Sequence, residues 1–126
     1  MGGPLRVLVV DEDRDILGLT KTFLNRAGED FLVETETSAQ VAVHRIESGD
    51  FDCVVSDYRM PGMDGLELLE QVRDLDADLP FFLVSAVLDE ETVDLAERTG
   101  VTGLVEKDAG TGHYEDLADR IRDATA

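Results

Sequence analysis

The 126-residue chain contains no tryptophan, only three prolines and a single cysteine. One cysteine cannot close an intrachain disulfide, so the fold must be held together by its own core. A chain of this length is about one domain long and buries a core without disulfides or a structural metal. No signal-like segment precedes the first apolar run. We therefore expect a single domain over residues 1–126, located in the cytoplasm.

Long apolar runs and basic residues are also scarce. The longest apolar runs, such as Val7–Val10 and Phe81–Val84, are far shorter than the roughly 20 residues of a membrane-spanning helix. Acidic residues number 29 against 11 lysines and arginines, which gives a formal net charge of −18. Nucleic acids and anionic membrane surfaces both attract basic segments. The composition therefore argues against direct nucleic-acid binding and against a membrane as a partner.

Lysine is especially scarce, because only Lys21 and Lys107 occur and the other basic residues are arginine. An excess of carboxylates with so little lysine resembles the composition of proteins from salt-loving organisms. A net charge of this size repels itself and destabilises the compact state unless salt screens it. The chain is therefore expected to be halophilic, and the alternative is an ordinary acidic protein.

Five short apolar runs recur along the chain, separated by segments with helical spacing. The runs are Leu5–Val10, Phe31–Glu34, Phe51–Ser56, Phe81–Ser85 and Thr102–Glu106. Strands that alternate with helices predict a parallel sheet, because parallel strands need crossover connections. The first and third runs suit central strands, whereas the second becomes polar towards Glu36 and suits an edge. The pattern predicts an α/β fold, a doubly wound, flavodoxin-like sheet of five parallel strands in the order 2-1-3-4-5 with five helices.

Apolar side chains at helical spacing indicate which face each helix buries. In the first helix these are Ile16, Thr20, Phe23 and Ala27, with Leu17 and Leu24 beside them, and in the last they are Tyr114, Leu117, Ala118 and Ile121. The helices between them are expected to bury Ala39, Ala42, Val43 and Ile46, then Leu66, Leu69 and Val72, then Val93 and Ala96. Asp13 and Ser38 are expected N-caps, and His44 and His113 are expected to face solvent.

Polar side chains follow the strands at the edge where ligands bind in an open parallel sheet. Asp11 and Glu12 follow the first strand, Asp57 the third and Lys107 the fifth, while Ser85 ends the fourth. Carboxylates this close repel one another unless a cation intervenes, and Mg²⁺ uses one or two carboxylates together with phosphate oxygens and water. Such a site suits phosphoryl transfer, with Asp57 attacking phosphorus and the metal and Lys107 offsetting phosphoryl charge.

Four motifs in this order resemble those of response-regulator receiver domains, the phospho-accepting modules of two-component signalling. They are the acidic turn at 7–13, an Asp-x-x-Met-Pro-x-x-Asp-Gly segment at 57–65, Ser85-Ala86 after the fourth strand, and Val105–Lys107 at the fifth. The resemblance covers residues 5–124, taken as the core of one receiver domain with no output domain in the chain. Whether the receiver acts alone by docking or belongs to a longer protein stays open.

The resemblance implies a role for each site residue. Asp57 takes a phosphoryl group from the phosphohistidine of a sensor histidine kinase. Mg²⁺ is held by Glu12, Asp57 and the backbone carbonyl of Arg59, with Asp11 helping through water, and the phosphoryl group is contacted by Ser85, Ala86 and Lys107. Phosphorylation then switches the surface around the fourth helix, the fifth strand and the fifth helix. The chain is expected to be a monomer or weak dimer that assists its own phosphorylation and dephosphorylation and is not otherwise an enzyme. A downstream or fused output domain is the further partner that the resemblance allows.

Two positions depart from the receiver pattern. Leu104 stands where many receivers carry an aromatic switch residue, so signalling is expected to rely on shifts of loops and helices. Asp108 follows Lys107 in place of the usual proline. A non-proline cis bond costs about 2.5 to 4 kcal/mol, which favours a trans bond and a looser loop over 108–112. Arg59, two positions after Asp57, is expected to tune the lifetime of the phosphorylated state.

Parts of the sequence are also compatible with other functions. A receiver-shaped docking module that is never phosphorylated is the main alternative, because of Leu104 and Asp108. A haloacid-dehalogenase-like phosphatase would use Asp11 as its nucleophile and leave Asp57 without a role. A calcium loop starting at Asp11 is excluded, since Ile16 replaces the required glycine. A flavodoxin-like electron carrier would need a Ser/Thr/Gly-rich phosphate loop after the first strand, and this sequence has none there.

The salt-adapted composition makes a direct prediction. The melting temperature should rise between low and molar potassium chloride, because the salt screens the repulsion among the excess carboxylates. Thermal melts followed by circular dichroism at the two salt concentrations measure this shift. A melting temperature that stays level or falls would identify an ordinary acidic protein.

Overall fold

The chain folds into five parallel strands that alternate with five helices. The computed structural model describes residues 3–28, 30–108 and 110–126. The elements are β1 (Leu5–Val10), α1 (Arg14–Ala27), β2 (Phe31–Glu36), α2 (Ala39–Ser48), β3 (Cys53–Asp57), α3 (Gly65–Leu75), β4 (Phe81–Ser85), α4 (Glu90–Thr99), β5 (Gly103–Glu106) and α5 (Gly112–Thr125). The strand order is β2-β1-β3-β4-β5, as predicted, with β2 at one edge.

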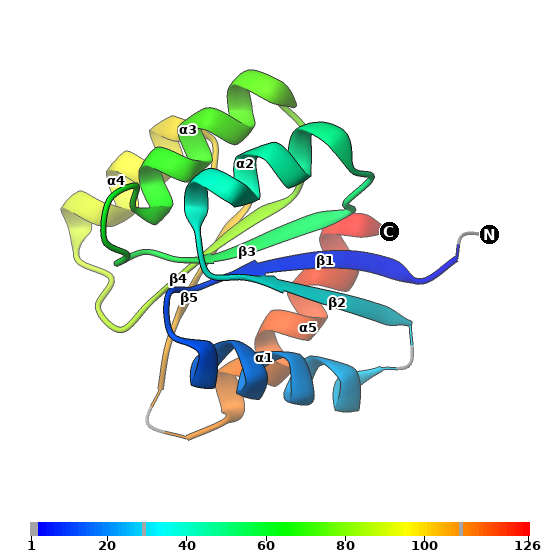
Figure 1. Ribbon diagram of the computed structural model, residues 1–126. Coiled ribbons are helices and arrows are strands. Elements are labelled where there is room, and N and C mark those ends of the chain that lie inside the picture. Colours follow the sequence, from blue (N-terminus) through cyan, green and yellow to red (C-terminus); the bar gives the residue numbers. More distant parts are fainter. Residues whose placement is uncertain (1–2, 29, 109) are drawn as a thin grey trace.

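Helices cover both faces of the sheet, with α2, α3 and α4 on one side and α1 and α5 on the other (Figure 1). Successive residues of a strand point to opposite faces, so each central strand feeds two cores. Val7 and Val9 of β1 lie in the core shared with α1 and α5, whereas Leu8 and Val10 lie in the core shared with the other three helices. The wholly apolar first strand is thus explained by burial on both sides.

The helices are amphipathic, and their ends carry the expected caps. Asp13 accepts hydrogen bonds from the first turn of α1, and Ser38 does the same for α2, which confirms both predicted N-caps. Asp64 forms a capping box with Glu67 at the start of α3. Among residues 3–28, 30–108 and 110–126, no helix has the length and apolar character needed to cross a bilayer.

Several boundaries and faces differ from the sequence prediction. β3 begins at Cys53 rather than at Phe51 and ends at Asp57, and β5 begins at Gly103 rather than at Thr102. The buried residues of α1 are Leu17, Thr20 and Leu24, so its inner face is turned away from the predicted stripe and Ala27 is exposed. In α4 the predicted Val93 is only partly buried and Thr92 is buried instead. Tertiary packing fixed these rotations, because both stripes of α1 contain enough apolar residues to be buried.

An ion-pair network fastens the edge strand to its neighbours. Glu34 of β2 accepts hydrogen bonds from Arg6 of β1 at 2.7 Å and from Arg45 of α2 at 2.7 Å. Arg45 also contacts Glu36 at 3.2 Å, and the guanidinium of Arg6 lies 4.6 Å from the centre of the Phe51 ring. The hydrogen bond from Arg6 is the main cause that lowers the pKa of Glu34 below its ordinary value, and the charge of Arg6 and the contact with Arg45 act in the same direction against burial. This network ties the polar end of β2 to the sheet and to α2.

Replacing Glu34 by glutamine should lower the free energy of unfolding by about 1 kcal/mol at neutral pH, because two arginines lose their charged partner. The pKa of Glu34 is lowered in the folded state. Its stabilisation is therefore full above the ordinary carboxyl pKa and is lost as the pH falls through the lowered folded-state value. The difference between wild type and Glu34→Gln should thus shrink to nothing in acid, which urea denaturation across the acid range measures.

The matched control is Glu70→Gln on α3, an exposed glutamate. It reports the effect of removing one negative charge from a strongly acidic chain, without the arginine contacts. A Glu34→Gln variant as stable as Glu70→Gln at neutral pH would contradict the role of the network.

Candidate acidic site at the strand ends

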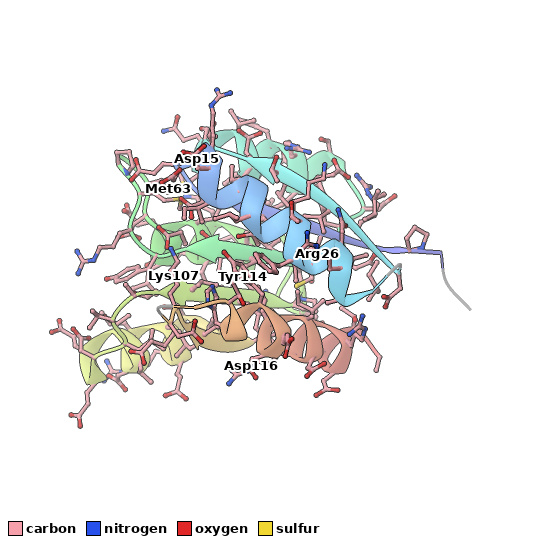
Figure 2. All side chains as sticks on the ribbon, turned by 90° about the horizontal axis from the view of Figure 1, so that it is seen from below. Asp15, Arg26, Met63, Lys107, Tyr114 and Asp116 are labelled. Carbon is pink, nitrogen blue, oxygen red and sulfur yellow. The ribbon has the colours of Figure 1, made fainter. Side chains whose placement is uncertain are left out.

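Three side chains meet where β1, β3 and β5 end. β1 and β3 pair in parallel with Val10 opposite Ser56, so Asp11 and Asp57 leave the sheet side by side. Lys107 directly follows β5, and its backbone N–H donates to the carbonyl of Ser85 at 2.9 Å. Figure 2 looks onto the face covered by α1 and α5, where Lys107 is labelled beside Tyr114 between the two helices. The crossover connections thus bring together residues that are distant in the sequence.

The lysine ammonium bridges the two carboxylates. Lys107 Nζ lies 2.8 Å from Asp57 Oδ1 and 3.9 Å from Asp11 Oδ2. The side chains of Asp11, Asp57 and Lys107 are 7%, 14% and 28% exposed, so the contact is partly screened from water. Attraction between charges grows as water is excluded, which makes this pair stronger than a surface ion pair.

Asp11 is the more enclosed of the two carboxylates. Burial, the largest effect, raises the pKa of Asp11 above its ordinary value, and the negative charge of Asp57 acts in the same direction. The backbone N–H of Asp13 donates to Asp11 Oδ1 at 2.9 Å and, together with Lys107, acts the other way. Asp11 therefore sits where a further cation would relieve both desolvation and repulsion.

The loop after Asp57 is packed tightly against the start of α3. The N–H of Gly65 donates to the carbonyl of Tyr58 at 2.8 Å, and Tyr58 in turn donates to the carbonyl of Val84. A Cβ atom at Gly65 would lie 2.4 Å from the carbonyl oxygen of Asp57 and 2.6 Å from Leu83 Cδ1. Glycine is thus required at 65 by a close approach of the α3 backbone to Asp57.

Ser85 ends β4 close to the site, but its hydroxyl is engaged in the loop that follows. Ser85 Oγ donates to the carbonyl of Val87 at 2.8 Å and accepts from the Val87 N–H at 3.3 Å. Ala86 is exposed, and Leu104 of β5 is half-buried against the core on the α2–α4 side. A contact between Ser85 and a phosphoryl group stays a prediction, and it requires the hydroxyl to leave the Val87 carbonyl.

The sequence prediction that three carboxylates flank one crevice is met by two of them. Among the described residues, no three His, Cys, Asp or Glu side chains converge closely enough to share a metal ion. Glu12 is exposed and lines a neighbouring hollow with Arg59 and Asp64, away from the Asp11–Lys107 contact. Asp11 and Asp57 alone still offer the one or two carboxylate ligands that Mg²⁺ takes together with water and phosphate oxygens. The oxygen donors present thus fit Mg²⁺.

A cavity adjoins the acidic site and was not anticipated from the sequence. It measures about 350 Å³ and lies between α1 and α5 under the loop that follows Lys107. Its lining residues include Ile16, Leu19 and Phe23 of α1, Asp57 and Lys107 at the strand ends, and His113, Tyr114 and Leu117 of α5. Spacing along one helix cannot reveal such a space, because it depends on how α1 and α5 pack against each other.

His113 corrects another expectation. Its side chain is only 10% exposed, whereas the sequence predicted a solvent-facing position. The ring packs against Tyr114 with centroids 4.1 Å apart, and Nδ1 lies 3.1 Å from Asp108 Oδ1. The Lys107–Asp108 peptide bond is trans, as expected for a residue other than proline. His44 is exposed, as predicted.

Comparison with known proteins gives one consistent result. The sequence model of the response regulator receiver domain matches residues 7–122. The chemotaxis protein CheY-3 of Vibrio cholerae is 30% identical over 122 residues, which cover 93% of this chain and 91% of that protein. The two-component response regulator ARR10 of Arabidopsis thaliana is 42% identical over 91 residues, or 71% of this chain and 16% of that protein.

Solved structures agree with the sequence matches. A CheY-like response regulator receiver domain protein from Methanospirillum hungatei superposes with a TM-score of 0.84 at 25% identity, covering 97% of both chains. Chemotaxis protein CheY4 of Vibrio cholerae gives a TM-score of 0.84 at 25% identity, covering 94% of this chain and 99% of that one.

The close approach at Gly65 predicts that Gly65→Ala destabilises the fold. The added methyl group would meet the Asp57 carbonyl oxygen and Leu83, and relieving this overlap should cost about 1 to 3 kcal/mol of unfolding free energy. Gly18→Ala is the matched control, because an added Cβ in α1 meets open space and should stabilise the helix by about 0.5 to 1 kcal/mol. Urea denaturation measures both, and a Gly65→Ala variant at least as stable as wild type would contradict the steric argument.

Proposed function

Because the chain belongs to the response regulator receiver domain family, we propose that Asp57 accepts a phosphoryl group from the phosphohistidine of a sensor histidine kinase. The observation that carries this proposal is the 2.8 Å contact between Lys107 Nζ and Asp57 Oδ1. It holds a cation against a partly accessible carboxylate, at the place where phosphoryl oxygens would arrive.

The proposed transfer exchanges one bond to phosphorus for another. A carboxylate oxygen of Asp57 forms a bond to phosphorus while the phosphorus–nitrogen bond of the phosphohistidine breaks. The electron pair of that bond stays with the imidazole nitrogen of the kinase, which is left neutral or takes up a proton from solvent. The product is an acyl phosphate on Asp57. Water later attacks phosphorus, the bond between phosphorus and the Asp57 oxygen breaks, and the carboxylate is restored as inorganic phosphate leaves. The chain is thus a phosphoacceptor that assists both of its own half-reactions, in place of an enzyme that turns over a separate substrate.

Lys107 has a role in both states of Asp57. Before transfer its ammonium pairs with the free carboxylate, and after transfer the same group can pair with a phosphoryl oxygen. Loss of Lys107 would leave Asp11 and Asp57 next to each other without that cation, which disfavours bringing a further anion to the site. The lysine therefore orients the acceptor and offsets the charge that the phosphoryl group adds.

A magnesium ion is part of the proposal. Asp11 and Asp57 would hold it, with Glu12 and the backbone carbonyl of Arg59 completing the set after local rearrangement. When bound, the ion offsets negative charge on the phosphoryl oxygens. The raised pKa of Asp11, caused first by burial and then by the charge of Asp57, is the sign of a site that favours such a cation.

Two other assignments have less support. A haloacid-dehalogenase-like phosphatase would need Asp11 as nucleophile, but this carboxylate is the less exposed of the two and accepts a hydrogen bond from Asp13. Lys107 also lies nearer to Asp57 than to Asp11. A docking module that is never phosphorylated would have no need for the enclosed Lys107–Asp57 pair.

The family and the chemistry also suggest a setting. We place the protein in the cytoplasm, as a monomer or weak dimer with a sensor histidine kinase as its partner. An acidic surface in a salt-rich cell accounts for the net charge of −18. A change in the loop between β4 and α4, driven by the Ser85 hydroxyl, would carry the signal to the surface of α4, β5 and α5.

Incubation with acetyl phosphate and Mg²⁺ should label wild type with one phosphoryl group on Asp57, detected by intact mass and by peptide mapping after hydroxylamine or borohydride treatment. Asp57→Asn should take up none, because the amide is a poor nucleophile. Chelation of the metal should slow labelling strongly.

Asp74→Asn, at an exposed aspartate of α3, is the matched control and should be labelled like wild type. Two results would support the phosphatase. One is labelling of Asp57→Asn. The other is loss of labelling in Asp11→Asn together with hydrolysis of phosphate esters by wild type. A wild type that takes up no label would support the unphosphorylated docking module.

A further inference from the structure

The position of Lys107 depends on the loop that follows it. β5 ends at Glu106, so beyond Lys107 the backbone is no longer held by the ladder of the sheet. α5 begins at Gly112, and its N-cap Thr111 makes no side-chain capping hydrogen bond. Among the described residues of the loop between Lys107 and α5, neither a strand ladder nor a capping side chain provides an anchor, yet Asp108, Gly110 and Thr111 line the cavity beside Asp57.

Asp108 supplies an anchor from within the loop. Its Oδ1 accepts a hydrogen bond from the Gly110 N–H at 3.0 Å and lies 3.1 Å from Nδ1 of His113. The carboxylate thus closes the loop on itself and joins it to the first turn of α5. The contact with His113 lowers the pKa of Asp108, which shows that the ionised carboxylate is the form that the pair favours.

His113 is held in turn by packing. Its side chain is 10% exposed and its ring lies 4.1 Å from that of Tyr114. Tyr114 stacks on Phe23 of α1 at 4.8 Å with the rings nearly parallel, at 6°. A carboxylate only accepts hydrogen bonds, so Nδ1 of His113 must carry the hydrogen. Side-chain contacts therefore run from Phe23 of α1 through Tyr114 and His113 to Asp108, the residue that follows Lys107.

We propose that Asp108 and His113 form a clasp that sets the position of the Lys107 ammonium against Asp57, which makes both of them positioning residues for phosphoryl transfer. This inference rests on the proposed function for its effect on transfer, but the position of Lys107 can be measured without any phosphoryl group. Misplacement of a catalytic group by a fraction of an ångström to one ångström lowers reaction rates substantially, so the clasp acts through Lys107 on the reaction at Asp57.

The clasp is sensitive to the charge of the imidazole. A protonated His113 adds a charge-assisted hydrogen bond to Asp108, whereas a neutral ring keeps a weaker one. The charged groups that share the cavity lining with His113 are Asp11, Asp57, Lys107 and Asp108, and the α1 side chains facing it are uncharged. Carboxylates therefore outnumber cations around the ring, and its protonation should tighten the clasp.

The scarcity of lysine makes the test direct. Selective ¹⁵N labelling of lysine side chains gives two ammonium signals, from Lys107 and from the exposed Lys21, which is an internal reference. His113→Phe keeps the ring against Tyr114 but removes the donor, and it should shift the Lys107 signal and leave that of Lys21 in place. His113→Asn places an amide N–H near the position of Nδ1 and should restore most of the wild-type signal.

Phosphorylation rates with acetyl phosphate and Mg²⁺ give the second readout. His113→Phe should react about three- to tenfold more slowly than wild type, the scale set by the net contribution of one ordinary hydrogen bond. His113→Asn should recover most of the rate, and its pH profile should be flatter than that of wild type because the amide carries no charge at any pH. His44→Asn, at the exposed histidine of α2, should keep the wild-type rate and profile.

The outcomes separate the two proposals. An unmoved Lys107 signal in His113→Phe would overturn the clasp, and so would a lower melting temperature with an unchanged rate and pH profile, since that marks a purely structural contact. A wild type that takes up no phosphoryl group would overturn the proposed function, while the lysine signals would still decide whether the clasp positions Lys107.

Discussion

The contact between Lys107 and Asp57 is the interaction on which the rest of the site depends. Parallel strands end at one edge, so the order β2-β1-β3-β4-β5 places Asp11 and Asp57 next to each other before any charge is considered. Two carboxylates enclosed in this way are unfavourable in a chain that already carries a net charge of −18. One of the only two lysines resolves the conflict, since its ammonium reaches both. The strand order brings the two carboxylates together, and the ammonium of Lys107 after β5 offsets the repulsion between them.

Arginine and lysine do different work in this molecule. Arginines are used where a planar fork can bind several acceptors: Arg73 donates to the carbonyls of Gly100, Asp76 and Leu79, and Arg122 joins the carbonyl of Ala27 to Asp30. These contacts join loops and helix ends near the amino ends of β2, β4 and β5, whereas the acidic site lies at the carboxyl ends of the strands. Lysine is instead a compact charge on a flexible stem, which can exchange one oxygen partner for another. In the proposed transfer Lys107 pairs first with a free carboxylate and then with a phosphoryl group, which requires that freedom.

The sequence was informative wherever a single periodicity or a strand end decided the outcome. Alternating strands and helices predicted the sheet order, the spacing of Tyr114, Leu117, Ala118 and Ile121 predicted the inner face of α5, and the strand ends predicted the meeting of Asp11, Asp57 and Lys107. It was less informative where two choices were equally apolar, as on α1, or where a loop path decided the partner. The sequence predicted a solvent-facing His113, because its burial depends on tertiary contacts that include the 3.1 Å contact between its Nδ1 and Asp108 Oδ1. Glu12 follows Asp11 directly in the chain, yet it is exposed and lines a separate hollow with Arg59 and Asp64.

In the proposed function the loop after β4 carries the signal without an aromatic switch residue. Besides the hydrogen bond that Ser85 Oγ accepts from the Val87 N–H, two others hold it: Ser85 Oγ donates to the carbonyl of Val87 at 2.8 Å, and the N–H of Leu88 donates to Glu106 of β5 at 3.4 Å. The hydrogen bond from Leu88 to Glu106 is longer than the one from Ser85 to Val87, and long hydrogen bonds are weak. Movement of the Ser85 hydroxyl would therefore act on a loop that is otherwise weakly held. Leu104 packs into the core on the α2–α4 side and offers no ring that could change between an inner and an outer position. If Ser85 turns to a phosphoryl group, the released Val87 carbonyl lies on an exposed residue and can be satisfied by water, which keeps the energetic difference between the two loop positions small. A small difference is what allows one added phosphoryl group to decide between them.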